Sequence, residues 1–339
     1  MIINNWNKTA YHTWRKNKQL LSRFIIFLCS FLVIYLFNFF VPRLMPGDPF
    51  AHNTAQSGQD MHGLSAEELL RLKAYYGLDK PVREQFINTV KGNLKLDFGQ
   101  SILYKKSVIE VIMSRLPWTV YIMLSTLLIS LFMGLFLALL GIGKPKLDSY
   151  ILKIMSLLAE IPAFLIGVLL LFLFAAKVSW LPLAGNLTPF YRHTGVLEYL
   201  FDVFRHSLLP ITALVLNMMP NFYFTARTSL QTILRKEYVF NAHAKGLAEK
   251  IIHYKYILLN ALFPILARFF LSVGTCIGGT MLIENVFAYP GLGKVLRDAV
   301  MYRDYILIQG VFLLSTTVVL FSSFISDVIN LYLQKDKLR

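Results

Sequence analysis

The stretch Pro117-Trp-Thr-Val-Tyr-Ile-Met-Leu-Ser-Thr-Leu-Leu-Ile-Ser-Leu-Phe-Met-Gly-Leu-Phe-Leu-Ala-Leu-Leu140 contains no charged residue. About 20 mostly apolar residues are enough for a helix to cross the hydrocarbon layer of a bilayer, so this stretch predicts a membrane-spanning helix. Five further segments meet or approach that length, at 24–41, 151–176, 208–224, 257–283 and 306–333. The sequence therefore predicts an all-α membrane protein with six transmembrane helices.

The overall composition supports a membrane protein. Of 339 residues, 56% are hydrophobic and 16% charged, whereas soluble domains carry about 25% charged residues. A net charge of +15 would suit a nucleic-acid partner, but here the basic residues border long apolar runs, so we expect no nucleic acid and a membrane instead. Cys29 and Cys276 lie inside apolar runs and form no Cys-x-x-Cys pair, which argues against thiol chemistry and structural zinc.

The distribution of basic residues predicts the orientation. With the N-terminus inside, the segments 1–23, 141–150, 226–256 and 334–339 are cytoplasmic and hold 16 Lys and Arg, against 6 in the short external segments 177–207 and 285–304. The long external segment 43–116 holds 10, but long loops cross largely regardless of charge. Both termini are therefore expected in the cytoplasm, with 1–23 as a basic tail, 24–41 as a retained anchor and 334–339 as a second tail.

The external loop, 42–116, has the sequence signals of small helices. Ser65-Ala-Glu-Glu68 and Ser107-Val-Ile-Glu110 match capping boxes. Gly77 can close the first helix as a left-handed residue, and Pro81 suits the first turn of the second. An apolar stripe of that second helix comprises Val82, Phe86, Val90 and Leu94. The loop is either a helical cap near an extracytoplasmic entrance or a lid that packs on the bundle.

The predicted core of five membrane helices spans 117–333. Within it, the cytoplasmic loop 226–256 has the strongest local sequence signal of a functional segment. Tyr238, Ala242 and Gly246 fall at i, i+4 and i+8, on one helix face. Basic residues flank this face, namely Arg235, Lys236, Lys245 and Lys250. The segment suits docking on another protein at the membrane surface, or alternatively an amphipathic helix that lies on anionic lipid.

Several stretches together resemble one protein family. Glu237-Tyr-Val-Phe-Asn-Ala-His-Ala-Lys-Gly-Leu247, followed by Asn260-Ala-Leu-Phe-Pro264, is similar to the cytoplasmic loop of ATP-binding-cassette (ABC) importer permeases. The resemblance is to the peptide/nickel family, in the branch of the first membrane subunit of dipeptide and oligopeptide importers. Further matching stretches are Met45-Pro-Gly-Asp-Pro49, Tyr76-Gly-Leu-Asp-Lys-Pro81, Asp97-Phe-Gly-Gln-Ser101, Glu284-Asn-Val-Phe-Ala-Tyr-Pro-Gly-Leu-Gly293 and Arg303-Asp-Tyr305.

The resemblance implies a type I importer permease fold in a bacterial cytoplasmic membrane. It implies that a coupling helix contacts the ATPase through Glu237, Tyr238, Ala242, Lys245, Gly246 and Leu247. Its partners would be a second homologous permease, two ATPase subunits that hold ATP and Mg, an extracytoplasmic substrate-binding protein and membrane lipid. The implied substrates are di- or oligopeptides, with nickel or metal chelates as the alternative. Phe240 and His243 stand where the family commonly has arginines.

The chain has no recognisable catalytic motif of its own. There is no G-x-x-x-x-G-K-[ST] phosphate loop, no H-E-x-x-H and no G-x-S-x-G, and the seven histidines lack metal-ligand spacing. We therefore expect no enzyme activity and neither metal nor cofactor in this chain, with ATP hydrolysed on a partner. The main alternative from another class is an ATP-independent secondary transporter, which the docking-like loop and the absence of an evident inverted repeat disfavour.

Polar residues inside the predicted spans are candidates for the pathway, because such groups usually face a bundle interior or a wet cavity. Glu160 either lines the pathway and meets a cationic substrate group, or is a structural carboxyl beside Pro162. Asn217 either lines the pathway or satisfies a carbonyl freed by Pro220. Arg268 is expected to snorkel toward the cytoplasmic side or to pair with a bundle carboxylate, with a structural use favoured, and Asp327 is expected to cap a helix or pair locally. Gly274 and Gly278 form a GxxxG spacing that permits close helix packing.

Overall fold

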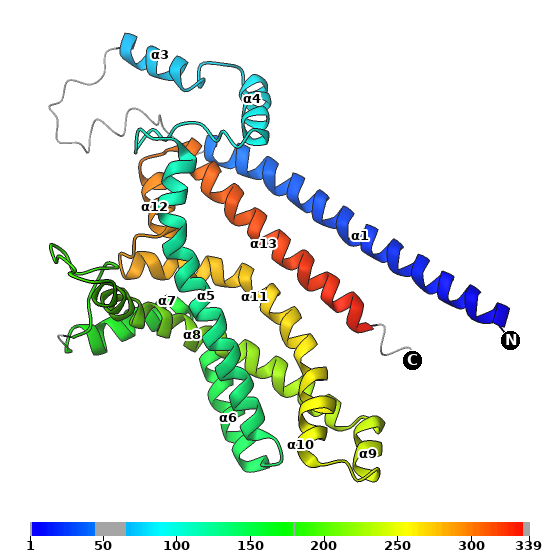
Figure 1. Ribbon diagram of the computed structural model, residues 1–339. Coiled ribbons are helices and arrows are strands. Elements are labelled where there is room, and N and C mark those ends of the chain that lie inside the picture. The colour runs from blue at the N-terminus through cyan, green and yellow to red at the C-terminus, as the bar shows by residue number, and fades with distance from the viewer. Residues whose placement is uncertain (1, 45–65, 179, 335–339) are drawn as a thin grey trace.

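The computed structural model describes residues 2–44, 66–178 and 180–334 (Figure 1). Their regular structure is helical, with π-helical turns at two places and one isolated bridge between Gln100 and Ser107. The predicted all-α class is confirmed.

Five helical stretches are long and apolar enough to cross a membrane. They lie in α1 (Ile2–Arg43), α5 (Val108–Gly141), α8 (Val196–Leu234), the continuous run of α10 (Glu249–Ile251), η2 (Ile252–Leu258) and α11 (Leu259–Val286), and α13 (Tyr305–Gln334). A sixth span exists if a bent helix pair counts as one. All six predicted segments therefore coincide with helices, although most helices extend beyond the predicted ends.

The bent pair forms the span predicted at 151–176. It consists of α6 (Pro145–Ala159) and α7 (Ala163–Leu170), which continues as η1 (Leu171–Ala175), and the two arms meet at 94°. The break falls at Pro162, which has no N–H to donate and disfavours helical backbone at the preceding residue. Glu160 is consequently the C-cap of α6, with an exposed side chain, and not a residue in the middle of a helix.

Helix α1 differs from the expected tail and anchor, because 2–43 form one helix. No glycine or proline interrupts the sequence before Pro42. The helix runs antiparallel to α13 (Figure 1), and Arg23 pairs with Asp327 of that helix at 3.2 Å. Asp327 thus has a partner that is distant in sequence.

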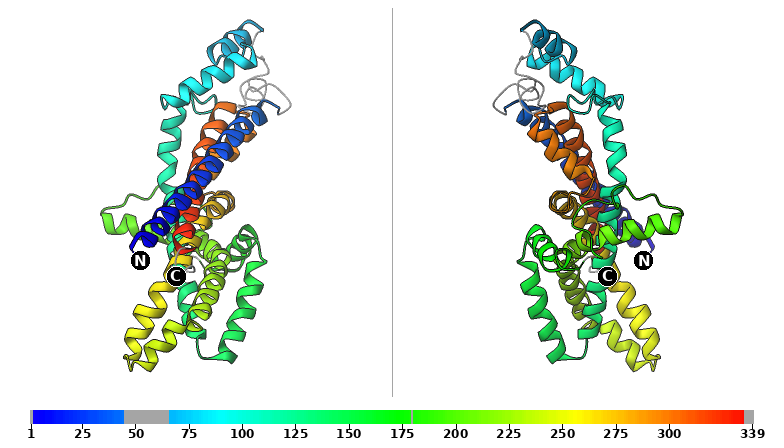
Figure 2. Two further views of the ribbon diagram at one scale, coloured as in Figure 1. Left: turned by 90° about the vertical axis from the view of Figure 1, so that its right-hand side faces the viewer. Right: turned by 90° about the vertical axis from the view of Figure 1, so that its left-hand side faces the viewer.

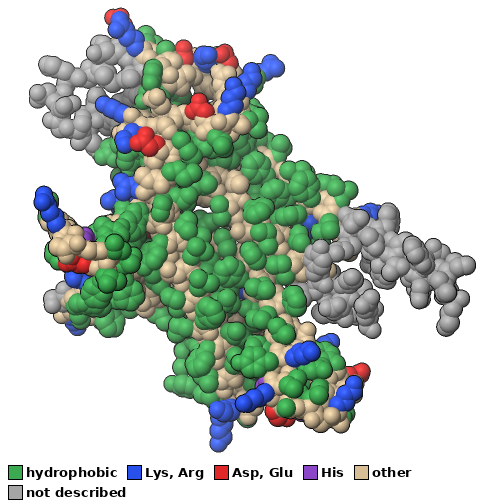
Figure 3. Space-filling model, in the orientation of Figure 1, with side chains coloured by type: hydrophobic (Ala, Val, Ile, Leu, Met, Phe, Trp, Pro, Cys, Tyr) green, Lys and Arg blue, Asp and Glu red, His purple; other side chains and the backbone are tan. Residues whose placement is uncertain are grey.

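Short helices form the two polar ends of the molecule. At one end lie α3 (Ala66–Tyr75) and α4 (Val82–Leu94), near α12 (Leu292–Met301), and at the other lie α9 (Glu237–Ala244) and the start of α6 (Figures 1 and 2). Charged side chains gather over both ends, and hydrophobic side chains cover the length between them (Figure 3). We call these the α4 end and the α9 end.

The loop before α5 follows its sequence signals where it is described. Gly77 has φ +65°, and the N–H of Leu78 donates to the carbonyl of Lys73 at 2.8 Å, as expected for a helix closed by a left-handed residue. Ser107 caps α5 by accepting a hydrogen bond from the N–H of Glu110 at 3.3 Å. The capping box that begins at Ser65 and the stretch 45–49 lie outside the described residues.

Helix α4 packs on the end of α1 through aromatic rings. Phe86 lies edge-on to Phe39, with ring centroids 5.0 Å apart, and within 6.2 Å of the Tyr35 ring. Asn93 donates to the Tyr35 hydroxyl at 2.9 Å. Leu94, at the end of the predicted stripe, is exposed instead. The loop therefore makes the packing contacts expected of a lid, which leaves a role at an entrance open.

The core of the bundle depends on close approach of α5 to α8. A β-carbon added at Gly134 would lie 2.8 Å from the Phe222 Cβ, 2.8 Å from the Tyr223 backbone nitrogen and 3.0 Å from the Met219 carbonyl oxygen. Two of these atoms belong to the backbone, so a side-chain rotation cannot make room. Only glycine fits where these helices meet.

We predict that Gly134→Leu destabilises the protein, because forcing extra carbons into a packed core costs about 1–3 kcal/mol. The measurement is the thermal unfolding midpoint of the detergent-solubilised chain. Gly195→Ala is the matched control, since a β-carbon there meets nothing within 4 Å and φ is −153°. Equal midpoints for Gly134→Leu and the unmodified chain would contradict the predicted close packing.

Candidate functional site

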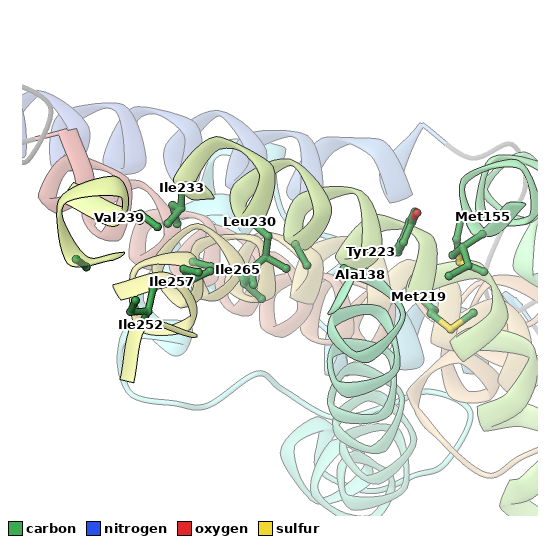
Figure 4. Packing of buried hydrophobic residues seen from close by; sticks show 14 of the residues in the cluster. Ala138, Met155, Met219, Tyr223, Leu230, Ile233, Val239, Ile252, Ile257 and Ile265 are labelled. Carbon is green, nitrogen blue, oxygen red and sulfur yellow. The ribbon is translucent and has the colours of Figure 1, made fainter. Parts of the chain in front are cut away.

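Helix α9 at the α9 end is the first candidate site. It follows α8 after the two residues Arg235 and Lys236. Its inner side is fixed by Val239 and Ala242, which are 3% and 2% exposed and belong to a cluster that joins α8, η2 and α11. Figure 4 shows Val239 beside Ile233, with Ile252 and Ile257 below them. The short helix is therefore held on the bundle and moves with it.

A glycine closes α9 and turns the chain back. Gly246 has φ +69°. Its N–H donates to the His243 carbonyl at 2.9 Å, and the N–H of Leu247 donates to the Ala242 carbonyl at 3.3 Å. This pair of bonds is the Schellman arrangement, which places a glycine at the left-handed position. The half-buried Leu247 then packs against the cluster that holds Val239.

The outward side of α9 differs from the predicted stripe. Tyr238 is partly exposed and Gly246 is open, but Ala242 between them is buried. The exposed side is centred instead on Phe240, which is 75% exposed, with Glu237 and Lys245 also exposed. Equal spacing on a helix places residues on one face but cannot tell which face is turned inward, and here the bundle takes the face that carries Ala242.

Tyr238 links α9 to the stretch that begins at Asn260. The Tyr238 hydroxyl and the Asn260 side chain share a hydrogen bond, and Asn260 also donates to the Tyr256 carbonyl at 2.7 Å. Burial raises the pKa of Tyr238, and the bond with Asn260 opposes that change. The stretches 237–247 and 260–264, which both resemble the family, are therefore in contact.

A second polar site lies at the break between α6 and α7. The first turn of α7 uses the Pro162 carbonyl, which accepts from the N–H groups of Leu165 and Ile166. The Ile161 carbonyl instead accepts from the Asn217 side chain of α8 at 2.8 Å. Asn217 therefore satisfies a carbonyl freed at Pro162, and not one freed at Pro220. Glu160 next to this bond stays exposed.

The two glycines of the GxxxG spacing have different surroundings. A β-carbon at Gly274 would lie 3.0 Å from Cγ1 of Val319, so this glycine makes room for α13. A β-carbon at Gly278 would meet nothing within 4 Å, so that position opens onto the surface of the described chain. On the same helix, Arg268 donates to Asn221 Oδ1 of α8 at 2.7 Å.

Asp304, before α13, lies in the stretch 303–305, which resembles the family. Its carboxylate contacts a second such stretch, 97–101. Its Oδ2 accepts from the Ser101 hydroxyl at 2.6 Å and from the Leu103 N–H at 3.0 Å. Its Oδ1 accepts from the Leu307 N–H at 3.0 Å, which caps α13. Burial raises the pKa of Asp304, while these hydrogen bonds oppose that rise. The segment before α5 is thus fastened to the start of the last helix.

Glu284, near the end of α11, forms a further contact between segments that are distant in sequence. It is fully buried, its Oε1 accepts from the Thr119 hydroxyl at 2.6 Å, and its Oε2 accepts from the Gly293 N–H at 2.6 Å. The Leu292 N–H donates in turn to Thr119 Oγ1 at 2.8 Å. Thr119 therefore ties α5, α11 and the start of α12 together. Sequence reasoning missed Thr119, because nothing near it in sequence signals a partner 165 residues away.

Comparison with known families places the chain among membrane transport components. The family described as binding-protein-dependent transport system inner membrane component matches residues 130–339. The chain belongs to this family, and the expected type I importer permease fold and multi-pass inner-membrane location follow from that membership.

Individual relatives match over nearly the whole chain. The di/tripeptide transport system permease protein DppB of Pseudomonas aeruginosa is 31% identical, over 88% of this chain and 92% of its own. The oligopeptide transport system permease protein AppB of Bacillus subtilis is 28% identical over 91% and 96%. The glutathione transport system permease protein GsiC of Salmonella choleraesuis is 28% identical over 91% and 95%. The resemblance to peptide permeases is thereby confirmed.

One solved structure is also similar. The crystal structure of an amino acid ABC transporter with histidines aligns with 68% of this chain and 94% of its own, at 14% identity and a TM-score of 0.45. That similarity is too low to add to the assignment. Within the described residues no group of three or more His, Cys, Asp or Glu side chains is placed to hold a metal ion.

We predict that Thr119→Val destabilises the protein while Thr119→Ser does not. Valine keeps the shape but leaves the Leu292 N–H and one Glu284 oxygen without their partner, at a cost of about 1–3 kcal/mol for each buried unsatisfied group. Serine restores the hydroxyl and serves as the matched control. The unfolding midpoint in detergent is the measurement, and a valine variant as stable as the serine variant would refute the role of Thr119.

Proposed function

We propose that this chain is the first membrane subunit of an ATP-driven importer of di- or oligopeptides. The observation that carries the proposal is the match, over nearly the full length, to relatives that are named as peptide permeases. In this proposal a second, homologous permease forms the other half of the pathway within the lipid bilayer. An extracytoplasmic binding protein delivers the peptide.

The energy for transport comes from ATP that other subunits hydrolyse. Two ATPase subunits bind ATP and Mg, and α9 is the helix on which they act. The support is mechanical: α9 is exposed on one side through Phe240 and fixed on the other through Val239 and Ala242. A force on the exposed side therefore passes into α8 and α11 through packed side chains. The α9 end is then the cytoplasmic end, as the charge bias of the sequence also suggests.

The pathway candidates of this proposal are Glu160, at the end of α6, and Asn217, on α8. Glu160 and Asn217 adjoin the break between α6 and α7, where the Asn217 side chain holds the Ile161 carbonyl. Broken helices in membranes occur where they line a cavity or are buried in protein. An exposed carboxylate beside such a break is placed to meet the amino group of a peptide.

The function is tested by reconstituting the complete transporter in liposomes, with its binding protein, and measuring uptake of a labelled dipeptide. Uptake that depends on ATP supports the proposal. Uptake driven by an ion gradient without ATPase subunits would establish a secondary transporter instead. ATP-dependent uptake of nickel or a nickel chelate, with none of peptide, would assign the chain to the metal-transporting members.

We predict that Phe240→Asp weakens capture of the ATPase subunits when the chain is purified under mild conditions, and lowers ATP-dependent uptake with it. A charge replaces the most exposed aromatic side chain of α9, so apolar contact area is lost. Phe190→Asp is the matched control, because Phe190 is also exposed but lies in the segment between η1 and α8. Normal capture with Phe240→Asp would place the ATPase contact elsewhere.

We predict that Glu160→Gln leaves expression and assembly unchanged but weakens uptake of peptides that carry a free amino group. The substitution keeps the shape of the side chain and removes its charge. Glu67→Gln, in the exposed helix α3, is the control for a charge change of the same kind. If uptake by the Glu160 variant equals that of the unmodified transporter, Glu160 has no pathway role.

A further inference from the structure

Helix α8 carries a polar stripe along a side that the described part of the chain covers only partly. Its members are half-buried or exposed and fall at helical spacing, namely Asn217, Asn221, Thr225, Thr228 and Thr232. The residues between them on the other faces, such as Met218, Phe222 and Leu230, are buried. Amide and hydroxyl groups gain nothing from contact with lipid tails, so this stripe is expected to face protein or water.

Helix α11 presents a similar open side next to this stripe. Arg268, Thr275 and Gly278 follow each other at spacings of seven and three residues, and all three are half-buried or exposed. Arg268 Nη2 donates to Asn221 Oδ1 at 2.7 Å, and Thr275 Oγ1 lies 3.9 Å from the Met218 sulfur. The two open sides are therefore adjacent, and Arg268 bridges them.

Arg268 differs from Arg23 and Arg227, two other arginines on the membrane helices, in what it contacts. Arg23 pairs with Asp327 at 3.2 Å, and Arg227 pairs with both oxygens of Asp148, at 2.7 and 2.5 Å. Among the described residues no carboxylate lies within ion-pair distance of Arg268. Its hydrogen-bond partner is the neutral amide of Asn221, and its Nε is buried with no hydrogen-bond partner. Its positive charge is therefore fixed in position but not compensated.

We propose that Arg268 is a binding residue for the carboxylate of the transported solute, and that a free C-terminal carboxylate is part of what this transporter recognises. The inference rests on the proposed function and names the substrate group that the pathway takes. A guanidinium presents several N–H donors in a planar fork that matches a carboxylate, and Asn221 occupies one of them. Apart from the buried Nε, the donors that Asn221 does not use remain for the solute.

The opposite charge adjoins the same stripe. Asn217 holds the Ile161 carbonyl, next to Glu160, and Asn221 holds Arg268. These two asparagines are four residues apart, which is about 6 Å along the helix axis. The exposed carboxylate of Glu160 therefore neighbours a carbonyl that Asn217 holds, and the uncompensated guanidinium is held by Asn221 on the same helix.

The test uses the complete transporter in liposomes with its unmodified binding protein. Uptake of dialanine is compared with uptake of dialanine amide, which lacks the carboxylate. For Arg268→Gln we expect the concentration of dialanine at half-maximal uptake to rise at least about tenfold, which corresponds to one lost charge-assisted contact. Uptake of the amide should change little. The binding protein is common to all samples, so its own preference cancels when each variant is divided by the unmodified transporter.

Two further variants guard against a purely structural effect. Asn221→Asp places a carboxylate beside Arg268 and should cause the same selective loss for dialanine, although the bridge between the helices is kept. Arg268→Lys keeps the charge and should retain part of the preference. Thr275→Val, on the same side of α11, is the matched control and should leave the ratio of the two substrates unchanged.

The outcomes separate this inference from the proposed function. If Arg268→Gln and Asn221→Asp lower uptake of both substrates equally, or of neither, Arg268 does not bind the carboxylate. Should Arg268→Gln fail to assemble, Asn221→Asp alone decides in the same way. If the unmodified transporter moves neither substrate with ATP, the proposed peptide function itself is wrong.

Discussion

A bilayer offers no hydrogen-bond partners to the polypeptide backbone, and much of this structure is arranged around that constraint. Straight helices meet it by themselves, so the break at Pro162 is the point that needs outside help. Asn217 supplies that help by donating to the Ile161 carbonyl. The end of α11 solves a related problem, since the N–H groups that open α12 donate to Glu284 and Thr119. At both places a polar side chain of another helix satisfies the exposed backbone groups.

These cross-helix bonds also explain which features the sequence alone could predict. Apolar runs and helix-end residues are local signals. The apolar runs predicted helices at all six spans, and the end residues predicted a helix end at Gly77 and a helix start at Ser107. The sharpness of the bend at 160–162 was not predicted, because a proline in an apolar run is compatible with either a kink or a sharp bend. Which one forms depends on what a neighbouring helix offers, and that contact is set by tertiary structure.

The candidate site was predictable to a similar extent. The existence of α9 followed from its spacing and from the family resemblance, but its inward face did not. A helix with small residues on one side can present that side either to a partner or to its own bundle. Here Ala242 lets α9 lie close to the cluster around Ile252, so the aromatic side chain of Phe240 is turned outward. Likewise, Ser101 and Asp304 each stood in a recognisable stretch, but only the fold brings them together.

The charges within the bundle show a division of roles. Arg23 and Arg227 are neutralised by carboxylates and serve to fasten helices, and replacing such a pair by apolar residues is often harmless to stability. Arg268 is held by an amide, which fixes its position while leaving its charge available. An aspartate at 221 would compensate that charge, whereas asparagine keeps it. A charge kept uncompensated among membrane helices is costly, and the cost is understandable if an anionic group periodically supplies the missing partner. Movement of α8 and α11, driven through α9, would then alter the site at which that group is bound.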